Sequence, residues 1–304
     1  MLKEKLNKID LENWKAPALR EDMPHGDMPG DKIKIDENHE LKASKIFPLL
    51  VEEILKCDQE KVAVAVFGGS GVGKSEIASL LTYYLQESGI GAYVLSGDNY
   101  PRRIPLYNDA ERFSIFRAAG LRGLLAEGLY GKEVQEKLDQ LWAEESDPDP
   151  KKTDEYPWLK AYQLYGRKAL KEYLGTDKEQ NYEEINAILK AFKEGKDKIY
   201  LKRMGRSEDE RWYDEVDFSE INVLLVEWTH GGNKALEGID IPVLLNSTPE
   251  ETREHRRLRA RDGKTDSAFT TMVLEIEQEE LDDRASSAKI IISKAGELLD
   301  PKAF

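Results

Sequence analysis

Short apolar runs alternate with helical patterns along the chain. The run Val62–Phe67 is rich in β-branched residues, and it is followed by a glycine cluster and by a helical pattern from Ser75. Strand, glycine turn and helix in this order are typical of the first unit of a parallel α/β sheet. Continuous apolar runs suit strands that are covered on both faces. The other predicted strands are Ala92–Ser96, Ile221–Glu227, Ile241–Asn246 and Lys289–Ser293.

Two segments stand outside this alternation. Residues 1–45 are polar and form a predicted N-terminal arm, in which the glycine- and proline-rich stretch Met23–Asp31 is a loop. A helical spacing of apolar residues follows over Leu41–Leu55. Between residues 128 and 200 there is no strong strand pattern, and apolar residues recur at helical spacing. We therefore predict a mostly helical insertion, 128–200, within one domain that spans 46–304.

The composition is that of a globular protein, and it narrows the expected partners. Of the 304 residues, 40% are hydrophobic, which is enough to bury a full core. The 45 basic and 59 acidic side chains give a formal charge of −14, and an acidic protein repels nucleic acid at long range. Cys57 is the only cysteine, which fits a reducing compartment. Since we see no signal-peptide pattern and no bilayer-length apolar run, we expect a cytoplasmic protein with neither nucleic acid nor membrane as partner.

The glycine cluster fits the phosphate-binding pattern G-x-x-x-x-G-K-[ST] at every position. Glycines let successive backbone N–H groups turn toward phosphate oxygens, and the following helix adds its positive N-terminal end. Lys74 can reach the β- and γ-phosphates, and the Ser75 hydroxyl can bind Mg²⁺. Because a strand pattern precedes the motif and a helix pattern follows it, we expect nucleotide binding rather than an inert turn. The residues of this P-loop are Gly68, Gly69, Ser70, Gly71, Val72, Gly73, Lys74 and Ser75.

The P-loop alone is shared by kinases, GTPases, ATPases and nucleotide-dependent regulators. Guanine recognition usually comes from an N-K-x-D string, and the nearest string, Asn233–Leu236, lacks the Asp. The GTPase class is therefore disfavoured. The choice among the remaining classes depends on the polar residues that follow the other predicted strands.

Asp98 lies just past the predicted strand Ala92–Ser96. A carboxylate in that position lies in the crevice where such sheets bind ligands. It can accept a proton from an attacking hydroxyl or help to hold a metal; the alternative is a turn Asp that satisfies its own loop. Arg102 and Arg103, a few residues later, either hold an anionic group of a substrate or are solvated.

Glu227 ends the predicted strand Ile221–Glu227 and is followed by Trp228 and, two residues further on, by His230. An acid at the end of a buried strand can bind Mg²⁺ directly or through water, and the alternative is a salt-bridged strand-end acid. His230 is ranked lower because a lone histidine is more often structural, but in this pocket it can touch a substrate.

Five arginines lie close together, at 253, 256, 257, 259 and 261. Thr248, Pro249 and Glu251 form a good helix start, so the arginines are predicted on a helix that begins near Pro249. A solvated basic face is the ordinary interpretation. In a chain of charge −14 the cluster instead indicates a bound anion, and we predict a lid over 249–266 with a hinge at Gly263. Its Arg257 and Arg261 would bind the nucleotide and stabilise charge on the transferring phosphoryl group.

These elements in this order resemble the phosphoribulokinase–uridine kinase group of P-loop kinases. The resemblance implies a catalytic base just past the second strand, the place of Asp98, and a Glu at the end of a later strand, the place of Glu227, where Trp228 replaces the usual Gly. It also implies a lid with an R-x-x-R-D-like string, which residues 257–262 match loosely. Gly97-Asp98-Asn99 is in addition similar to adenylylsulfate kinase. The resemblance covers Val62–Ser75, Ser96–Arg103, Asn222–Gly231, Pro242–Asp262 and, weakly, Lys289–Leu298.

In uridine-kinase-like proteins the stretch before the Glu227 strand carries substrate contacts. Here it holds Tyr200–Arg206, whose basic residues suit a polyhydroxylated or anionic acceptor; a surface hairpin is an equal alternative. The residues predicted to bind substrate are Asp98, Tyr100, Arg102, Arg103, Lys202, Arg203, Arg206 and His230.

The expected fold is a doubly wound α/β P-loop NTPase fold, with a mainly parallel five-stranded sheet, a helical insertion and an arginine-bearing lid. The expected function is an ATP- and Mg²⁺-dependent kinase that phosphorylates a hydroxyl of a small metabolite, either a sugar, a polyol, a hydroxy acid or a nucleoside. Lys74 and Asp98 are the predicted catalytic residues with the lid arginines, and Ser75 and Glu227 the predicted metal ligands. Adenylylsulfate kinase and a non-catalytic nucleotide switch are the alternatives, and a homo-oligomer is possible.

Overall fold

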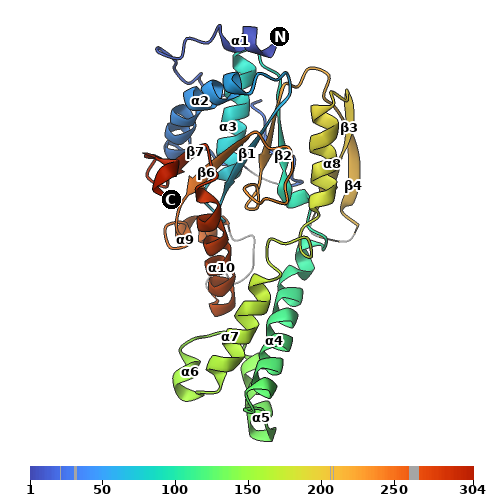
Figure 1. The fold of residues 1–304 in the computed structure, drawn as a ribbon, viewed down its shortest axis with the longest axis vertical. Coiled ribbons are helices and arrows are strands. Elements are labelled where there is room, and N and C mark those ends of the chain that lie inside the picture. The colour runs from blue at the N-terminus through green and yellow to red at the C-terminus, as the bar shows by residue number, and fades with distance from the viewer. Residues whose placement is uncertain (21, 31–32, 206, 208, 260–266) are drawn as a thin grey trace.

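The computed structural model describes residues 1–304 except 21, 31–32, 206, 208 and 260–266, and only the backbone of 258 and 259. Within the described residues a six-stranded sheet has the order β2-β5-β1-β6-β7-β8 (Figure 1). The strands from β2 to β7 in this order are parallel, and β8 is antiparallel to β7. The expected five-stranded parallel core is confirmed, with one short strand added. The strands are β1 (Val62–Gly68), β2 (Ala92–Ser96), β5 (Val223–Glu227), β6 (Ile241–Asn246), β7 (Ile290–Ser293) and β8 (Leu298–Leu299).

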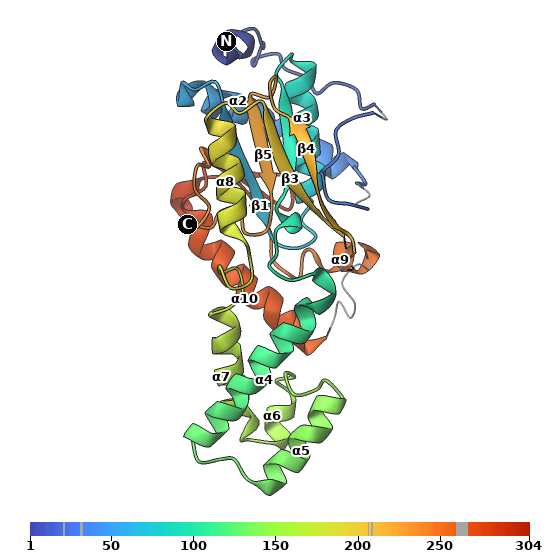
Figure 2. The same ribbon diagram turned by 90° about the vertical axis from the view of Figure 1, so that its right-hand side faces the viewer.

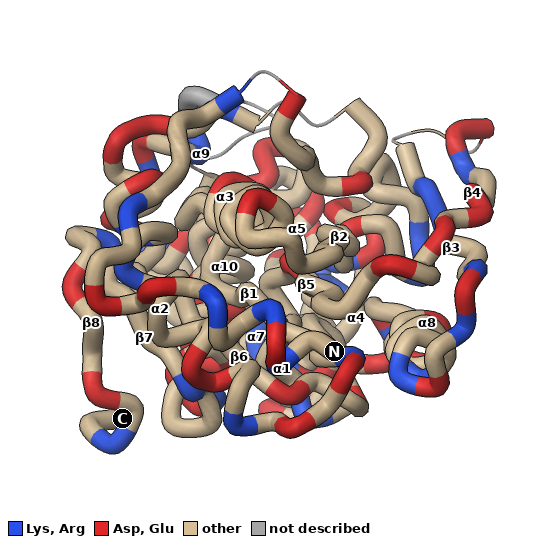
Figure 3. The backbone as a smooth tube through the Cα atoms, turned by 90° about the horizontal axis from the view of Figure 1, so that it is seen from above, with Lys and Arg blue, Asp and Glu red and all other residues tan. Residues whose placement is uncertain are grey.

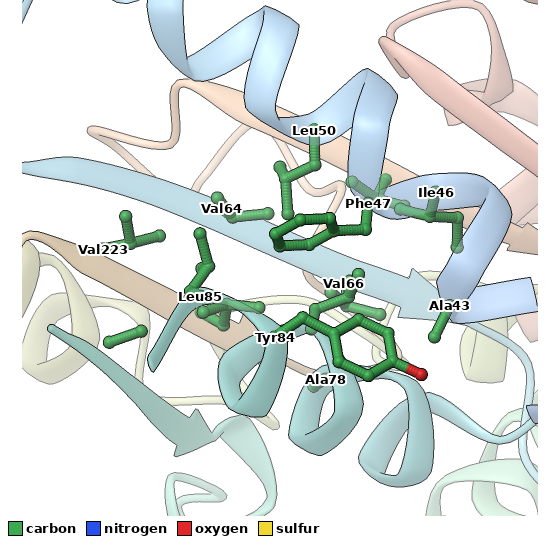
Figure 4. Close-up of a cluster of buried hydrophobic side chains, with 14 of the residues drawn as sticks. Ala43, Ile46, Phe47, Leu50, Val64, Val66, Ala78, Tyr84, Leu85 and Val223 are labelled. Carbon is green, nitrogen blue, oxygen red and sulfur yellow. The ribbon is translucent and has the colours of Figure 1, made fainter. Parts of the chain in front are cut away.

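Side chains of β1 alternate between the two faces of the sheet, as the period of two in a strand requires. Val64 and Val66 pack against α2 (Glu37–Cys57) and α3 (Lys74–Glu87) in one core. Figure 4 shows side chains of both helices meeting over the strand. Full burial of each such side chain stabilises the fold by ~1.5–3 kcal/mol, so this face fixes the sheet on which the P-loop stands. The labelled side chains are Ala43, Ile46, Phe47, Leu50, Val64, Val66, Ala78, Tyr84, Leu85 and Val223.

The opposite face of the sheet is covered by α8 (Tyr182–Lys193) together with the antiparallel ribbon β3–β4, and by α10 (Ala268–Ala285). Strand β3 (Lys198–Met204) pairs with β4 (Arg211–Asp217), so the hairpin considered from the sequence exists. It is not only a surface hairpin, because Lys202 and Arg203 are buried.

Helices α4 to α7 form a projection that extends away from the sheet (Figures 1 and 2). Helices α4 and α7 cross closely, with Gly120 against the Tyr162 ring and Gly166 against the Phe116 ring. The segment 128–200 is therefore rich in helices, but the projection already begins with α4, and α8 packs on the sheet instead. The bounds are α4 (Asn108–Ala126), α5 (Lys132–Ala143), α6 (Lys152–Glu155) and α7 (Leu159–Lys171), preceded by 3₁₀ turns at Gly97–Asn99 and Pro105–Tyr107.

The N-terminal segment is attached to the sheet domain along much of its length. It starts with α1 (Leu2–Leu6), whose two leucines are buried. Helix α2 begins at Glu37, with Asp36 accepting a hydrogen bond from the backbone N–H of His39, so the expected boundary at residue 45 falls inside this helix. Among the described residues, no helix combines the length and the apolarity that crossing a bilayer requires. A 3₁₀ turn, Pro301–Ala303, ends the chain.

The arginine-rich helix α9 (Arg253–Arg259) begins later than the sequence predicts. The expected capping interaction forms, because Thr248 and Glu251 exchange hydrogen bonds of 2.7 and 3.3 Å, but residues 249–252 are turns rather than helix. Arg261, Asp262 and Gly263 lie outside the described residues, so the predicted hinge and one predicted phosphate contact cannot be placed.

Candidate active site

The sheet topology brings three sequence signals to one edge. Strand β5 lies between β2 and β1, and Glu227 is in register with Ser96 of β2 and with Val66 of β1. The P-loop follows β1, Asp98 follows β2, and Glu227 ends β5. Because carboxyl ends of parallel strands share an edge, residues that are distant in sequence form one crevice.

The P-loop has the backbone shape that its glycines permit. Gly71 and Gly73 have φ of 78° and 99°, a region that residues with a Cβ rarely adopt. A Cβ on Gly73 would also lie 2.6 Å from Nε2 of His39, so the start of α2 is packed directly on the loop. Helix α3 begins at Lys74, and the positive end of its dipole faces the loop. This arrangement is suited to an anion with several oxygens.

Lys74 is half-buried, and its Nζ donates a hydrogen bond of 3.1 Å to the carbonyl oxygen of Gly69. The ammonium group is thus folded over the loop, where the predicted phosphates would lie. Val72 is buried in the core below, whereas Ser70 is partly exposed at the turn of the loop.

Ser75 and Glu227 form the polar pair that the metal prediction requires. Ser75 Oγ donates to Glu227 Oε2 at 3.3 Å, and Ser96 Oγ donates to Glu227 Oε1 at 2.5 Å. Glu227 is 3% exposed. Among the described residues, no group of three or more His, Cys, Asp or Glu side chains is arranged so that it could hold a metal ion. One hydroxyl and one carboxylate fit Mg²⁺, which usually completes its shell with waters and substrate phosphates.

Asp98 is exposed in the turn that follows β2, at the same edge as Glu227. Its neighbour Asn99 is buried, and Asn99 Oδ1 accepts a hydrogen bond of 3.0 Å from the backbone N–H of Met204. The turn carrying Asp98 is therefore tied to β3. An exposed carboxylate on a fixed turn can receive an acceptor hydroxyl.

Arg256 of helix α9 lies against the P-loop, although it was not among the arginines selected from the sequence. A Cβ on Gly71 would come within 3.0 Å of Cγ of Arg256, whose Nη1 donates to Thr252 Oγ1 at 2.5 Å. Arg257 is exposed on another side of α9, and its predicted phosphate contact stays a prediction. A cavity of about 10 Å³ between the P-loop, the 247–252 segment, Arg256 and α10 is too small for a triphosphate. Nucleotide entry at this point therefore requires movement.

A polar cleft of about 260 Å³ lies beyond Asp98, between the β3–β4 ribbon and the start of α8. Glu184 is central to it: Tyr213 Oη donates to Glu184 at 2.7 Å, Asn181 Nδ2 at 2.9 Å and Lys202 Nζ at 3.3 Å. The cleft thus offers a carboxylate, an amide, a phenol and cations. The lining residues are Pro101, Arg102, Asn181, Glu184, Lys202, Arg211 and Tyr213.

Three more of the predicted substrate residues, Tyr100, Arg103 and Arg203, do not line this cleft. Tyr100 is fully buried below Lys202, whose Nζ lies 5.4 Å from the centre of its ring. Arg103 points to the base of the projection, where it binds Glu111 at 2.9 Å. Arg203 points into the interior, and Arg206 lies outside the described residues. For these residues, substrate contact remains a prediction.

His230 belongs to a buried charged cluster at the junction of the sheet, α4 and α10. Burial lowers the pKa of His230 to about 4, and Glu179 opposes this shift. Arg112 bridges two acids, with its Nη2 2.7 Å from Glu179 and 4.0 Å from Glu277. Burial raises the pKa of Glu277 to about 7, while Arg112 lowers it. Sequence patterns gave no sign of this cluster, because its members come from four distant segments.

Comparison with known proteins gives one related sequence of assigned function. No family model matches the chain. The bifunctional alpha-galactosidase/sucrose kinase AgaSK of Mediterraneibacter gnavus is 38% identical over 255 residues, which are 83% of this chain and 22% of that protein. The chain therefore spans about a fifth of the length of this relative.

Two solved structures are similar to this structure at lower sequence identity. One is a putative fructose transport system kinase from Silicibacter sp. TM1040, with 14% identity, a TM-score of 0.49 and coverage of 80% of this chain and 94% of that one. The other is a possible uridine kinase from Bacillus stearothermophilus, with 16% identity, a TM-score of 0.41 and coverage of 81% and 97%.

Proposed function

We propose that this protein is an ATP- and Mg²⁺-dependent kinase that transfers the γ-phosphoryl group to a hydroxyl of a small metabolite, with a sugar as the preferred acceptor class. The observation that carries the proposal is the contact between Ser75 of the P-loop and Glu227 at 3.3 Å, at the sheet edge that also presents Asp98. The phosphate-binding loop, the proposed metal ligands and the proposed proton acceptor then lie at one edge of the sheet, as phosphoryl transfer needs.

The chain's own residues have distinct parts in the proposed reaction. Lys74 and the P-loop N–H groups hold the triphosphate, and Ser75 and Glu227 would hold Mg²⁺, which neutralises charge on phosphate oxygens. Asp98 orients the acceptor hydroxyl and takes its proton as the new P–O bond forms and the bond to the leaving ADP breaks. Most of the rate enhancement would come from positioning and from charge stabilisation.

The sugar class is favoured by the cleft and by the relative. A carboxylate, an amide and a phenol around one cleft can exchange hydrogen bonds with several hydroxyls at once, as Glu184, Asn181 and Tyr213 are placed to do. The relative that matches over most of this chain has sucrose kinase in its name. We extend that activity to this chain only as a proposal.

The same proposal includes a cytoplasmic location and small molecules as ligands. Acidic and basic positions are interspersed along the backbone in Figure 3. Together with the charge of −14, this supports small-molecule rather than nucleic-acid partners. A homo-oligomer stays possible.

An acceptor panel tests the proposal. Sucrose, glucose, fructose, uridine and adenylylsulfate are incubated with ATP and Mg²⁺, and phosphorylated products are identified by mass spectrometry. We expect a phosphorylated sugar as the main product. Phosphorylation of adenylylsulfate or uridine alone would reject the sugar class, and nucleotide binding without any product would favour the regulatory switch.

A matched pair of variants tests whether the acceptor binds in the cleft. Tyr213→Phe removes the hydroxyl that binds Glu184 in the cleft, while Tyr200→Phe makes the same change at an exposed tyrosine of the same ribbon that is not among the residues lining the cleft. The first should raise the KM for the acceptor about tenfold, since the Tyr213 hydroxyl would no longer orient Glu184 or hydrogen-bond the acceptor, a loss of about 1.4 kcal/mol, and the second should leave it unchanged. Equal KM values in both would place the acceptor elsewhere.

A further inference from the structure

The N-terminal arm runs along the sheet domain and reaches the carboxyl edge of the strands. Tyr83 Oη of α3 donates to the carbonyl oxygen of Ala18 at 2.7 Å, and Arg20 binds Glu87 at 2.9 Å, so the arm lies beside α3 (Figure 2). Met23 is buried in the core formed by α2, α3 and the sheet. The arm then turns into the edge where β2 and β5 end.

Asp27, at this turn, makes more hydrogen bonds than a loop carboxylate needs for its own turn. Its Oδ1 accepts from the backbone N–H of Ser96 at 2.7 Å and from Asn99 Nδ2 at 3.0 Å. Its Oδ2 accepts from Arg203 Nη1 at 2.8 Å and from Tyr93 Oη at 3.2 Å. The Asp27 side chain is only 6% exposed and that of Arg203 9%. A buried carboxylate with four donors from two strands and a turn fixes those elements relative to one another.

Three of the four partners of Asp27 are bonded to, or adjacent in sequence to, a residue of the proposed site. Ser96 donates its hydroxyl to Glu227, the proposed metal ligand. Asn99 directly follows Asp98, the proposed proton acceptor. Arg203 directly follows Lys202, which lines the acceptor cleft. Asp27 is therefore connected through one residue to the metal ligand, to the base and to the cleft.

The preceding residue borders the metal site itself. A Cβ on Gly26 would lie 4.0 Å from Oε1 of Glu227. This distance is an ordinary contact, so alanine fits there, but a longer side chain would extend along the proposed metal ligand.

We propose that the segment Met23–Gly30 is a built-in part of the active site, and that Asp27 is a positioning residue that sets the turn of Asp98 and the β3–β4 ribbon against the sheet. This inference rests on the proposed function for what is positioned, but the contacts themselves can be tested without it.

The charge state of Asp27 agrees with such a role. Burial, the largest effect, raises the pKa of Asp27 to about 6, while the Arg203 guanidinium lowers it. Asp27 is therefore ionised at neutral pH, when its ion pair with Arg203 is intact. Arg203 also binds the half-exposed Asp214, with its Nε 3.1 Å from Asp214 Oδ2. Removing Asp27 therefore leaves the buried guanidinium with only this more exposed partner.

The experiment separates positioning from a merely structural role by removing one charge or both. Asp27→Asn removes the buried partner of Arg203 and leaves only Asp214, so it should lower both the unfolding temperature and kcat. The double variant Asp27→Asn/Arg203→Met removes both charges, so its unfolding temperature should return close to that of wild type. We expect its kcat to stay at least 10²-fold below wild type, with the Kd for a non-hydrolysable ATP analogue changed by less than about threefold. The matched control Asp22→Asn makes the same change on an exposed part of the arm, and it should behave as wild type.

Recovery of kcat together with stability in the double variant would overturn the proposal, because Asp27 would then be structural only. A variant at Gly26 gives an independent measurement: Gly26→Leu should lower kcat strongly at unchanged unfolding temperature, whereas Gly26→Ala should not. Equal kcat values for these two variants would also count against the proposal that this segment is part of the active site.

Amide hydrogen exchange keeps the inference testable if no acceptor is found. Asp27→Asn should accelerate exchange at least tenfold in peptides that cover 94–104 and 200–205, relative to Asp22→Asn. An unchanged pattern would reject the positioning role. Faster exchange in Asp27→Asn, combined with a wild-type protein that transfers no phosphate, would reject the proposed function while leaving the role of Asp27 in place.

Discussion

At the scale of single residues, the account depends on short polar contacts at one sheet edge. Ser75 and Glu227 are 3.3 Å apart although the sequence separates them by 152 residues. Asp98 stands on a turn whose other two residues, Gly97 and Asn99, are buried, and Asn99 accepts a hydrogen bond from the backbone of β3. A carboxylate that is exposed on a rigid support can act on a substrate at little cost to the fold.

Asp98→Asn tests the proposed proton acceptor. An amide keeps the size of the side chain but cannot take a proton, so kcat should fall by ~10²–10⁴-fold while nucleotide affinity stays within a few-fold. Steady-state kinetics and calorimetry with an ATP analogue measure the two quantities. Normal turnover, or a joint loss of binding and of fold, would show that Asp98 is structural.

The arginine helix gives a second test at this scale. Arg256 packs on Gly71, whereas Arg257 was selected from the sequence because of its helical spacing. We expect Arg256→Ala to lower kcat/KM for ATP by ~10²-fold or more, since a charge next to the P-loop is desolvated when the site closes. Arg257→Ala is the comparison. A larger loss in Arg257→Ala would mean that the face predicted from the sequence closes over the nucleotide.

At the scale of elements, helices and strands bring these residues together through close packing. Helices α4 and α7 approach so closely that Gly120 lies against the ring of Tyr162. Helix α10 connects the projection to the sheet, because its first half packs with α4 and α7 and its second half with β6 and β7. The buried acids of α10 lie at this junction.

Gly120→Ala tests the helix crossing. In an exposed helix this change stabilises by ~1 kcal/mol, but here the new Cβ would lie 2.5 Å from Cδ2 of Tyr162. We expect a net loss of ~1–3 kcal/mol in the free energy of unfolding, measured by urea denaturation. Ser114→Ala, at an exposed position of α4, is the control and should be neutral or stabilising. A stabilised Gly120→Ala protein would contradict the crossing.

The pH dependence of stability tests the junction at Glu277. Its pKa is raised from 4.5 to about 7 when the protein folds, so the folded state binds more protons than the unfolded state between these values. The stability associated with this carboxyl is complete below about pH 4.5 and is lost as the pH rises through about 7.

Glu277→Gln removes the titrating carboxyl, and with it the loss of stability at high pH. The unfolding temperature of the variant should exceed that of wild type at pH 8, and the difference should vanish near pH 5. Glu275→Gln, which changes an exposed acid on the same helix, should show no such trend. A difference that is constant with pH, or that grows on acidification, would disprove the buried position of Glu277.

At the scale of the whole molecule, the sequence predicted what local pattern determines. The five parallel strands appear as apolar runs, and the P-loop appears as an exact spacing of glycines, Lys74 and Ser75. Long-range contacts left no such trace: Asp27 and Arg203 are 176 residues apart, and Asp27 stands in a stretch that is predicted only as loop. Arg256 was overlooked because the i, i+4, i+8 spacing selected Arg253, Arg257 and Arg261, and spacing alone does not show which face of the helix meets the P-loop.

The central claim is that this molecule moves a phosphoryl group from ATP to a hydroxyl of a small metabolite. The most direct measurement follows γ-³²P-labelled ATP with Mg²⁺ and sucrose, and counts ADP and labelled sugar in the same reaction, with Lys74→Ala in parallel. We predict one labelled sugar for each ADP, and a rate lower by ~10²–10³-fold in Lys74→Ala, because the charge that bridges the phosphates is lost. ADP release without labelled sugar or any other labelled acceptor, or normal turnover in Lys74→Ala, would contradict the account.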